Sequence, residues 1–123
     1  MFWKDRGVPD RTFPFSPRST VVLEVGDLIA VPCEPGWACL QVTDLKGRGP
    51  GARTVFVAGV LPWRGDEPPT CDEVKGLRAT EQGLVPIEVF TQGGLQVVDQ
   101  AVVVHAGLAS NFRDFGVGTV HKV

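Results

Sequence analysis

The residues of this sequence that could perform chemistry include three cysteines and two histidines. Cys33, Cys39, Cys71, His105 and His121 all carry atoms that bind transition metals. Structural zinc sites place paired cysteines about two to four residues apart, whereas Cys33 and Cys39 are six apart. We therefore predict no metal site, and we interpret the thiols as small apolar groups that pack in or near the core.

Nucleophilic catalysis would need a base beside an activated hydroxyl or thiol. His105 follows three valines, Ser110 follows a Gly-Leu-Ala loop, and the chain lacks a Gly-x-Ser-x-Gly motif. We interpret His105 as a structural histidine at a strand end. The sequence does not say what His105 and His121 contact.

Paired carboxylates, Asp66 with Glu67 and Asp72 with Glu73, follow Trp63 in the sequence. Such pairs can perform acid–base chemistry, but a solvated charged segment explains them more simply. We predict no catalytic residues, no cofactor and no enzymatic activity.

Two tryptophans are expected at the rim of the fold, since Trp37 follows a Pro-Gly turn and Trp63 follows Pro62. A ring in that position either covers the core or anchors a partner. The acids near Trp63 would favour a basic partner. The predicted partner-binding residues are Trp37, Trp63, Asp66, Glu67, Asp72, Glu73 and Glu81.

The glycine-rich stretch at residues 46–53 contains Lys46, Arg48 and Arg53. It carries no aromatic residue on which a base could stack, and the net charge of the chain is −2. We therefore expect a solvated hairpin tip and no nucleic-acid partner.

At 123 residues, with 43% hydrophobic and 21% charged residues, the sequence is typical of one globular domain. It starts without a secretion-signal pattern and has no apolar run long enough to cross a membrane. An odd number of cysteines favours a reducing compartment. We expect a cytoplasmic protein with no membrane partner.

Short β-branched runs separated by 15 glycines and 10 prolines predict strands and turns. The expected strands are residues 21–25, 27–33, 37–44, 54–61, 85–91, 95–99 and 102–105, with 117–121 as a further candidate. Thr70 and Glu73 form a capping-box pattern for a helix of about two turns that ends near Gly76. The fold class is mostly β: a small antiparallel, partly open (SH3-like) barrel or a curled sheet, with at most one short helix.

Residues 1–20 combine three prolines with phenylalanines and lack a regular period. We expect an extended arm whose aromatic side chains cover an open sheet edge. Residues 21–123 would form the single domain.

One stretch of the sequence resembles the opening of the immunity protein 26 family of small bacterial β-rich proteins. The similarity covers residues 21–44 and is carried by a Gly-Asp pair, an aliphatic strand, a proline and an aromatic turn. The matching positions are Gly26, Asp27, Pro32 and Trp37. Family members are associated with polymorphic or contact-dependent toxin systems, so the resemblance implies an immunity protein that binds and neutralises a cognate toxin.

Two alternatives remain open. The first is a small-barrel endoribonuclease toxin, in which Arg48 or Arg53 binds phosphate with help from Thr54 or Ser110. The second is a structural or regulatory β-barrel subunit. The sequence identifies neither the toxin nor the oligomeric state.

Overall fold

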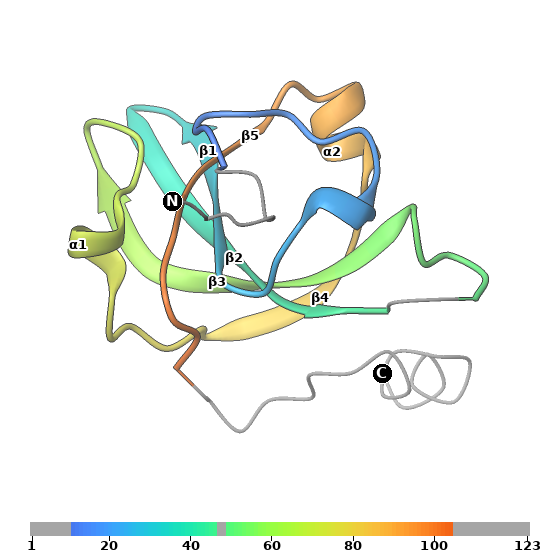
Figure 1. The fold of residues 1–123 in the computed structure, drawn as a ribbon. Helices are drawn as coiled ribbons and strands as arrows, with labels where there is room; N and C mark the ends of the chain where they lie inside the picture. The colour runs from blue at the N-terminus through green and yellow to red at the C-terminus, as the bar shows by residue number, and fades with distance from the viewer. Residues whose placement is uncertain (1–10, 47–48, 105–123) are drawn as a thin grey trace, which may run out of the picture.

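The computed structural model describes residues 11–46 and 49–104, which form one antiparallel sheet (Figure 1). The elements are η1 (Thr20–Val22), β1 (Asp27–Cys33), β2 (Gly36–Leu45), β3 (Val55–Gly65), α1 (Cys71–Val74), β4 (Glu81–Pro86), α2 (Glu88–Thr91) and β5 (Gln96–Gln100). The strand order is β4-β3-β2-β1-β5. The mostly β prediction is confirmed in its curled-sheet form, because this sheet does not close into a barrel.

The sheet is covered on both faces. Successive strand residues point to opposite faces, so the neighbours Leu28 and Ile29 enter different buried clusters. The first cluster consists of Leu23, Ile29, Val42, Phe56, Ala58, Ile87, Phe90 and Val97. The second consists of Leu28, Cys39, Leu61, Val74 and Ala101.

Register shifts accompany the curl of the sheet. Pairing between β2 and β3 shifts twice, between Ala38 and Leu40 and again between Val42 and Asp44. Pairing between β1 and β5 shifts between Leu28 and Ile29. Such irregularities bend a strand and increase its twist, which lets a sheet of five strands wrap around the first cluster.

Three of the expected strands are wrong in whole or in part. Residues 21–25 include part of η1, because the Ser19 hydroxyl accepts the Val21 N–H (3.3 Å) and caps a 3-10 turn. Residues 85–91 divide between β4 and α2, since Pro86 has no N–H to continue the ladder. The described residues therefore contain two short α-helices where at most one was expected.

Of the expected strand at residues 102–105, His105 lies outside the described residues, and residues 102–104 form only one bridge, in which Val104 pairs with Arg78. Val102 is 87% exposed and makes no strand pairing within the described residues. The candidate strand at 117–121 lies outside the described residues.

The helix predicted from the Thr70–Glu73 pattern is present as α1, but it is four residues long and not two turns. The Thr70 N–H donates to Glu73 Oε1 (3.2 Å), which is one half of a capping box. Lys75 leaves the helical conformation and Gly76 has a φ of +86°, so the chain turns away there. Val74 fixes α1 to the second cluster.

The segment before η1 runs along the free edge of β5. The Phe15 N–H donates to the Val97 carbonyl (3.0 Å), and the Val97 N–H donates to the Phe15 carbonyl (2.8 Å). The rings of Phe13 and Phe15 pack against the first cluster. An edge that could otherwise pair with another chain is thereby covered.

Candidate functional site

The β1–β2 turn and the end of β3 enclose a small cavity beside Trp37. Its volume is about 190 Å³, and its lining consists of Cys33, Pro35, Gly36, Trp37, Arg64, Gly65 and Asp66. Strand pairing creates it, because Trp37 lies opposite Gly65 and Asp66 follows directly. The sheet thus brings together two of the predicted partner-binding residues, Trp37 and Asp66.

Two glycines allow this close approach. A Cβ placed on Gly36 would lie 2.2 Å from the Gly65 carbonyl oxygen, and one on Gly65 would lie 2.5 Å from the Trp63 ring. A larger residue at position 36 would force the β1–β2 turn away from the end of β3, and one at position 65 would displace the Trp63 ring. The glycines therefore set the width of the cavity.

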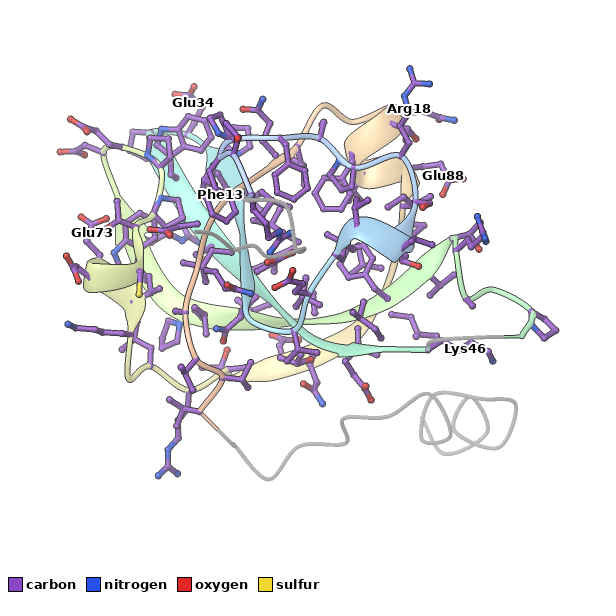
Figure 2. All side chains as sticks on the ribbon, in the orientation of Figure 1. Phe13, Arg18, Glu34, Lys46, Glu73 and Glu88 are labelled. Atoms are coloured by element: carbon purple, nitrogen blue, oxygen red, sulfur yellow. The ribbon has the colours of Figure 1, made fainter. Side chains whose placement is uncertain are left out.

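We call this part of the molecule the acidic end. It consists of Trp37 with the exposed acids of the β1–β2 turn, of the segment after β3 and of α1: Glu34, Asp66, Glu67, Asp72 and Glu73. Figure 2 shows Glu34 and Glu73 on the same side of the molecule, with Arg18 and Lys46 on the other. Local cations moderate the charge, because Lys75 pairs with Asp72 (3.5 Å) and Arg64 lines the cavity.

The two tryptophans have different surroundings. Trp63 packs against the second buried cluster, which fits a ring that covers the core. Trp37 is half-buried and lines the cavity, so part of its ring remains available to a partner.

Glu81 lies apart from the other predicted residues. It pairs with Val60, whereas Trp37 pairs with Gly65 of the same strand. This separation along β3 corresponds to roughly 15 Å in extended chain. The structure therefore gives no reason to include Glu81 in the acidic end.

Sequence reasoning missed Glu34, Cys33 and Arg64 at this end. The Arg64 Nη1 lies 3.1 Å from the Cys33 Sγ. The Pro35-Gly36 turn was the available signal, because a hairpin closed there places Cys33 beside the start of β2 and close to the end of β3.

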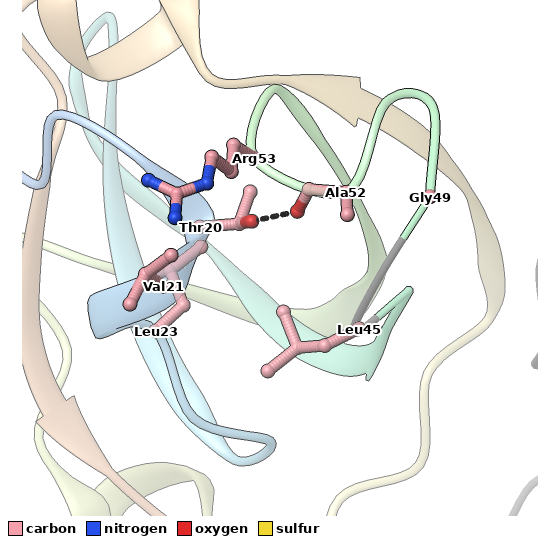
Figure 3. A pocket seen from close by; sticks show the side chains of 7 residues that line it. All are labelled: Thr20, Val21, Leu23, Leu45, Gly49, Ala52 and Arg53. Atoms are coloured by element: carbon pink, nitrogen blue, oxygen red, sulfur yellow. Dashed lines mark hydrogen bonds between the residues drawn. The ribbon is translucent and has the colours of Figure 1, made fainter.

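The opposite end of the sheet holds a second cavity, lined by η1 and the β2–β3 connection (Figure 3). Arg53 lines it, and the neighbouring Thr54 is exposed. Arg48 and Ser110, the other residues of the ribonuclease alternative, lie outside the described residues. The structure therefore gives no geometry for that set as a whole.

The Gly-Asp pair of the family-like motif has a clear structural role. Gly26 has a φ of +105°, and a Cβ there would lie 2.6 Å from the Ala101 carbonyl oxygen. Asp27 is fully buried, and its Oδ2 accepts the Glu24 N–H (2.9 Å). Gly26 thus forms the turn into β1, and Asp27 bonds to the backbone of that turn.

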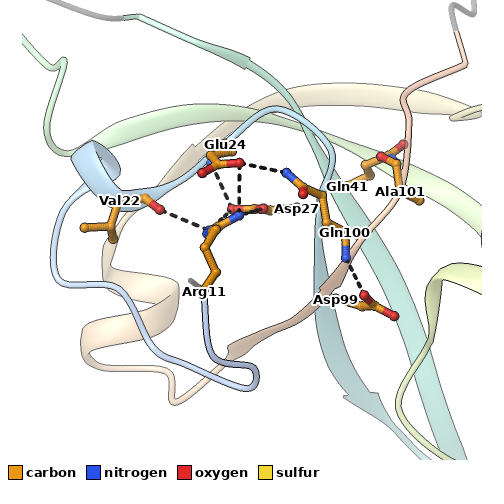
Figure 4. Close-up of polar contacts among 8 residues, drawn as sticks. All are labelled: Arg11, Val22, Glu24, Asp27, Gln41, Asp99, Gln100 and Ala101. Atoms are coloured by element: carbon orange, nitrogen blue, oxygen red, sulfur yellow. Dashed lines mark hydrogen bonds and ion pairs between the residues drawn. The ribbon is translucent and has the colours of Figure 1, made fainter. Parts of the chain in front are cut away.

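Asp27 also binds a residue that sequence reasoning did not connect to it (Figure 4). The Arg11 guanidinium donates to both carboxylate oxygens, with Nη2 at 2.7 Å from Oδ2, and also to the Val22 carbonyl (3.1 Å). The hydrogen bond to Asp27 raises the pKa of Arg11. The buried acid is thus paired through the segment that precedes η1.

Pro32 and Trp37, the remaining motif positions, face each other in the β1–β2 ladder. The pairing of β5 with β1 covers Asp27 to Ala30, so no strand of the described residues pairs with β1 on that side at Pro32. A residue without an N–H is tolerated there. The motif therefore extends along β1 from Asp27, which binds Arg11, to Trp37 of the acidic end.

The cysteines are separate thiols in three environments. Cys39 is fully buried, and burial raises its pKa to about 12. The Cys71 N–H donates to Asp99 Oδ2 (2.7 Å). Within residues 11–46 and 49–104, no group of three or more histidine, cysteine or acidic side chains could hold a metal ion. His105 and His121 lie outside this range.

No helix in the described part of the chain has the length and apolar character needed to span a membrane. Comparison with known proteins gave no match among family models, curated proteins or solved structures. The residues of the chain, their geometry and the resemblance of residues 21–44 are therefore what indicates its function.

Proposed function

We propose that this chain is a non-catalytic, cytoplasmic immunity protein that binds a cognate bacterial toxin through the acidic end. The protein would act by covering the active site or the substrate path of the toxin. The Gly26, Asp27, Pro32 and Trp37 pattern supports the immunity class. The acidic end supplies the surface.

The observation that carries the proposal is the position of Trp37. Its half-buried ring borders a cavity of about 190 Å³ and has exposed acids nearby. Aromatic anchors beside small pockets, surrounded by polar side chains, are typical of residues that dominate binding energy. A cavity of this size fits one protruding side chain of a partner protein.

The charge of the surface indicates what kind of toxin it fits. Asp66, Glu67, Asp72 and Glu73 would attract a basic surface and speed its association. Enzymes that act on nucleic acids carry such surfaces, because their substrates are polyanions. A toxin with a basic substrate path is therefore the expected partner.

The direct test is rescue by co-expression. The toxin domain encoded beside the gene of this protein is induced with the wild-type chain, with Trp37→Ala or with Asp66→Lys. We expect the wild type to restore growth and both variants to protect less. If no toxin-like domain is encoded nearby and no candidate toxin is neutralised, the proposal fails.

The variants need a matched control. Glu88→Lys introduces the same charge change as Asp66→Lys, but Glu88 is an exposed residue of α2, on the other side of the molecule (Figure 2). It should protect as well as the wild type. Loss of protection in Glu88→Lys would show a general charge effect and contradict a localised surface.

The two alternatives give different outcomes in the same cells. An endoribonuclease toxin would stop growth when expressed alone, and the purified chain would degrade RNA. A structural subunit would co-purify stoichiometrically with a partner that is not a toxin. Either result would replace the immunity proposal.

A further inference from the structure

The cavity beside Arg53 is large enough to hold a small molecule. Its volume is about 510 Å³, within the range of roughly 300–1,000 Å³ that is common for ligand sites. Its lining consists of Thr20, Val21, Leu23, Leu45, Gly49, Ala52 and Arg53. These residues come from η1, the segment after it, the end of β2 and the β2–β3 connection (Figure 3).

Hydrogen bonds hold the two walls of this cavity together. The Thr20 N–H donates to the Arg53 carbonyl (3.1 Å), and the Thr20 hydroxyl donates to the Ala52 carbonyl. The Ala52 N–H donates in turn to the Gly49 carbonyl (3.0 Å). The cavity is therefore formed in advance, with these backbone groups already satisfied.

One charged group of the lining remains available. Within the described residues, the Arg53 guanidinium makes no hydrogen bond or ion pair, and Figure 3 shows it extending past Thr20 toward Val21. A guanidinium offers two parallel N–H groups, which match the two oxygens of a carboxylate.

Apolar side chains form part of the remaining lining, beside the Thr20 hydroxyl and backbone groups. Val21 is 65% exposed, Leu45 is half-buried, and Leu23 belongs to the first buried cluster. None of the lining residues is aromatic, so no ring is present for a nucleic-acid base to stack on. The aliphatic side chains and the Arg53 guanidinium together favour a ligand that has an apolar body and one negatively charged end.

We propose that this cavity binds a carboxylate attached to an apolar body, with the carboxylate on Arg53 and the body against Val21, Leu23 and Leu45. Two sources share this chemistry: a free medium-chain or aryl acid, and the last residue of a peptide that ends in an apolar side chain. This site is separate from the acidic end and does not depend on its function.

The test is a titration of the full ¹⁵N-labelled chain, followed by its amide NMR signals. The probes are decanoate, acetate, 1-decanol and a short leucine-ended peptide with either a free or an amidated carboxyl end. Decanoate should shift the signals of Thr20, Val21, Leu45 and Arg53 more than acetate or decanol does. A response to the free-ended peptide that exceeds the decanoate response would assign the peptide source.

Two variants make the outcome decisive. Arg53→Ala should weaken decanoate binding about tenfold, as expected for loss of a charge-assisted hydrogen bond. Val21→Glu, at an exposed position, should abolish it. Arg18→Ala removes the same charge from a residue outside the cavity lining and should bind like the wild type.

Unchanged binding in Arg53→Ala, or signal shifts confined to other parts of the chain, would overturn the proposal. Absence of any decanoate or peptide response in the wild type would also overturn it. Thermal unfolding of each variant confirms that the fold is intact, because the Thr20 N–H bond to the Arg53 backbone survives side-chain removal.

Discussion

The acidic end and the Arg53 cavity lie at opposite ends of the β2–β3 pair and differ in charge and in size. The cavity beside Trp37 measures about 190 Å³, and the cavity beside Arg53 measures about 510 Å³. The first has an aromatic ring and exposed acids around it. The second has a lining of mixed polarity, with three aliphatic side chains and the Arg53 guanidinium, which makes no ion pair within the described residues. On the two proposals above, one sheet would present a surface for a protein at one end and a site for a small molecule at the other.

The two ends also differ in how they are supported. Arg11 contacts Asp27 and the Val22 carbonyl, so the network of Figure 4 supports η1 and with it the wall of the Arg53 cavity. The acidic end depends on strand pairing and on the packing of Trp63 and Val74. Substitutions can therefore weaken one end and leave the other in place.

The largest expected effect follows from Arg11→Ala. It would leave the fully buried Asp27 carboxylate without its partner, which costs about 3–5 kcal/mol. Urea denaturation measures the loss. Adding Asp27→Asn to this variant should recover part of it, because the buried charge is then removed. A loss below about 1 kcal/mol would show that the ion pair does not hold η1 in place.

A second prediction compares the two tryptophans. Trp63→Ala should lower the free energy of unfolding by about 2–4 kcal/mol, since its ring packs on the second cluster. Trp37→Ala should cost less than about 1 kcal/mol, because Trp37 packs against neither cluster of the described residues. Thermal unfolding distinguishes them, and equal losses would contradict the assignment of Trp37 as the available ring.

The third prediction concerns pH and Cys39. Burial raises the pKa of its thiol from an ordinary value of 9.0 to about 12, so above pH 9 the unfolded chain loses a proton that the folded chain retains. Stability therefore falls as pH rises, by about 1.4 kcal/mol at pH 10. Cys39→Ala should lack this loss. Parallel pH profiles for the two proteins would contradict burial of the thiol.

The smallest effect is expected at the surface of the acidic end. Lys75 pairs with Asp72 at 3.5 Å, but their side chains are 67% and 91% exposed. Lys75→Ala should change the free energy of unfolding by less than about 0.5 kcal/mol. A loss above 1 kcal/mol in chemical denaturation would mean that α1 depends on this pair.

Local patterns in the sequence were sufficient for part of the fold. Residues 27–33 form β1 at the predicted bounds, because aliphatic residues there lie between a Gly-Asp turn and a Pro-Gly turn. The α2 segment was missed, since four residues are too few for a helical period to emerge. Packing of Phe90 on Phe56, with ring centroids 5.7 Å apart, stabilises it as a helix.

The candidate site, like the fold, was predictable only where neighbouring residues of the sequence determine the contact. Trp37 and Asp66 line the same cavity because the position of the turn sets the register of the hairpin. The pairing of Arg11 with Asp27 spans 16 residues and has no local signal. The Arg53 cavity was not predictable either, because it depends on a 3-10 turn where the sequence indicated a strand.

The proposed interface at Trp37 is tested by the Kd of the cognate toxin domain for the wild type, Trp37→Ala and Arg53→Ala, measured by calorimetry under one salt condition. We predict that Trp37→Ala weakens binding by more than about fivefold, equivalent to over 1 kcal/mol, and that Arg53→Ala binds as the wild type does. Weakened binding in Arg53→Ala together with wild-type affinity in Trp37→Ala would place the toxin at the Arg53 cavity and contradict binding through the acidic end.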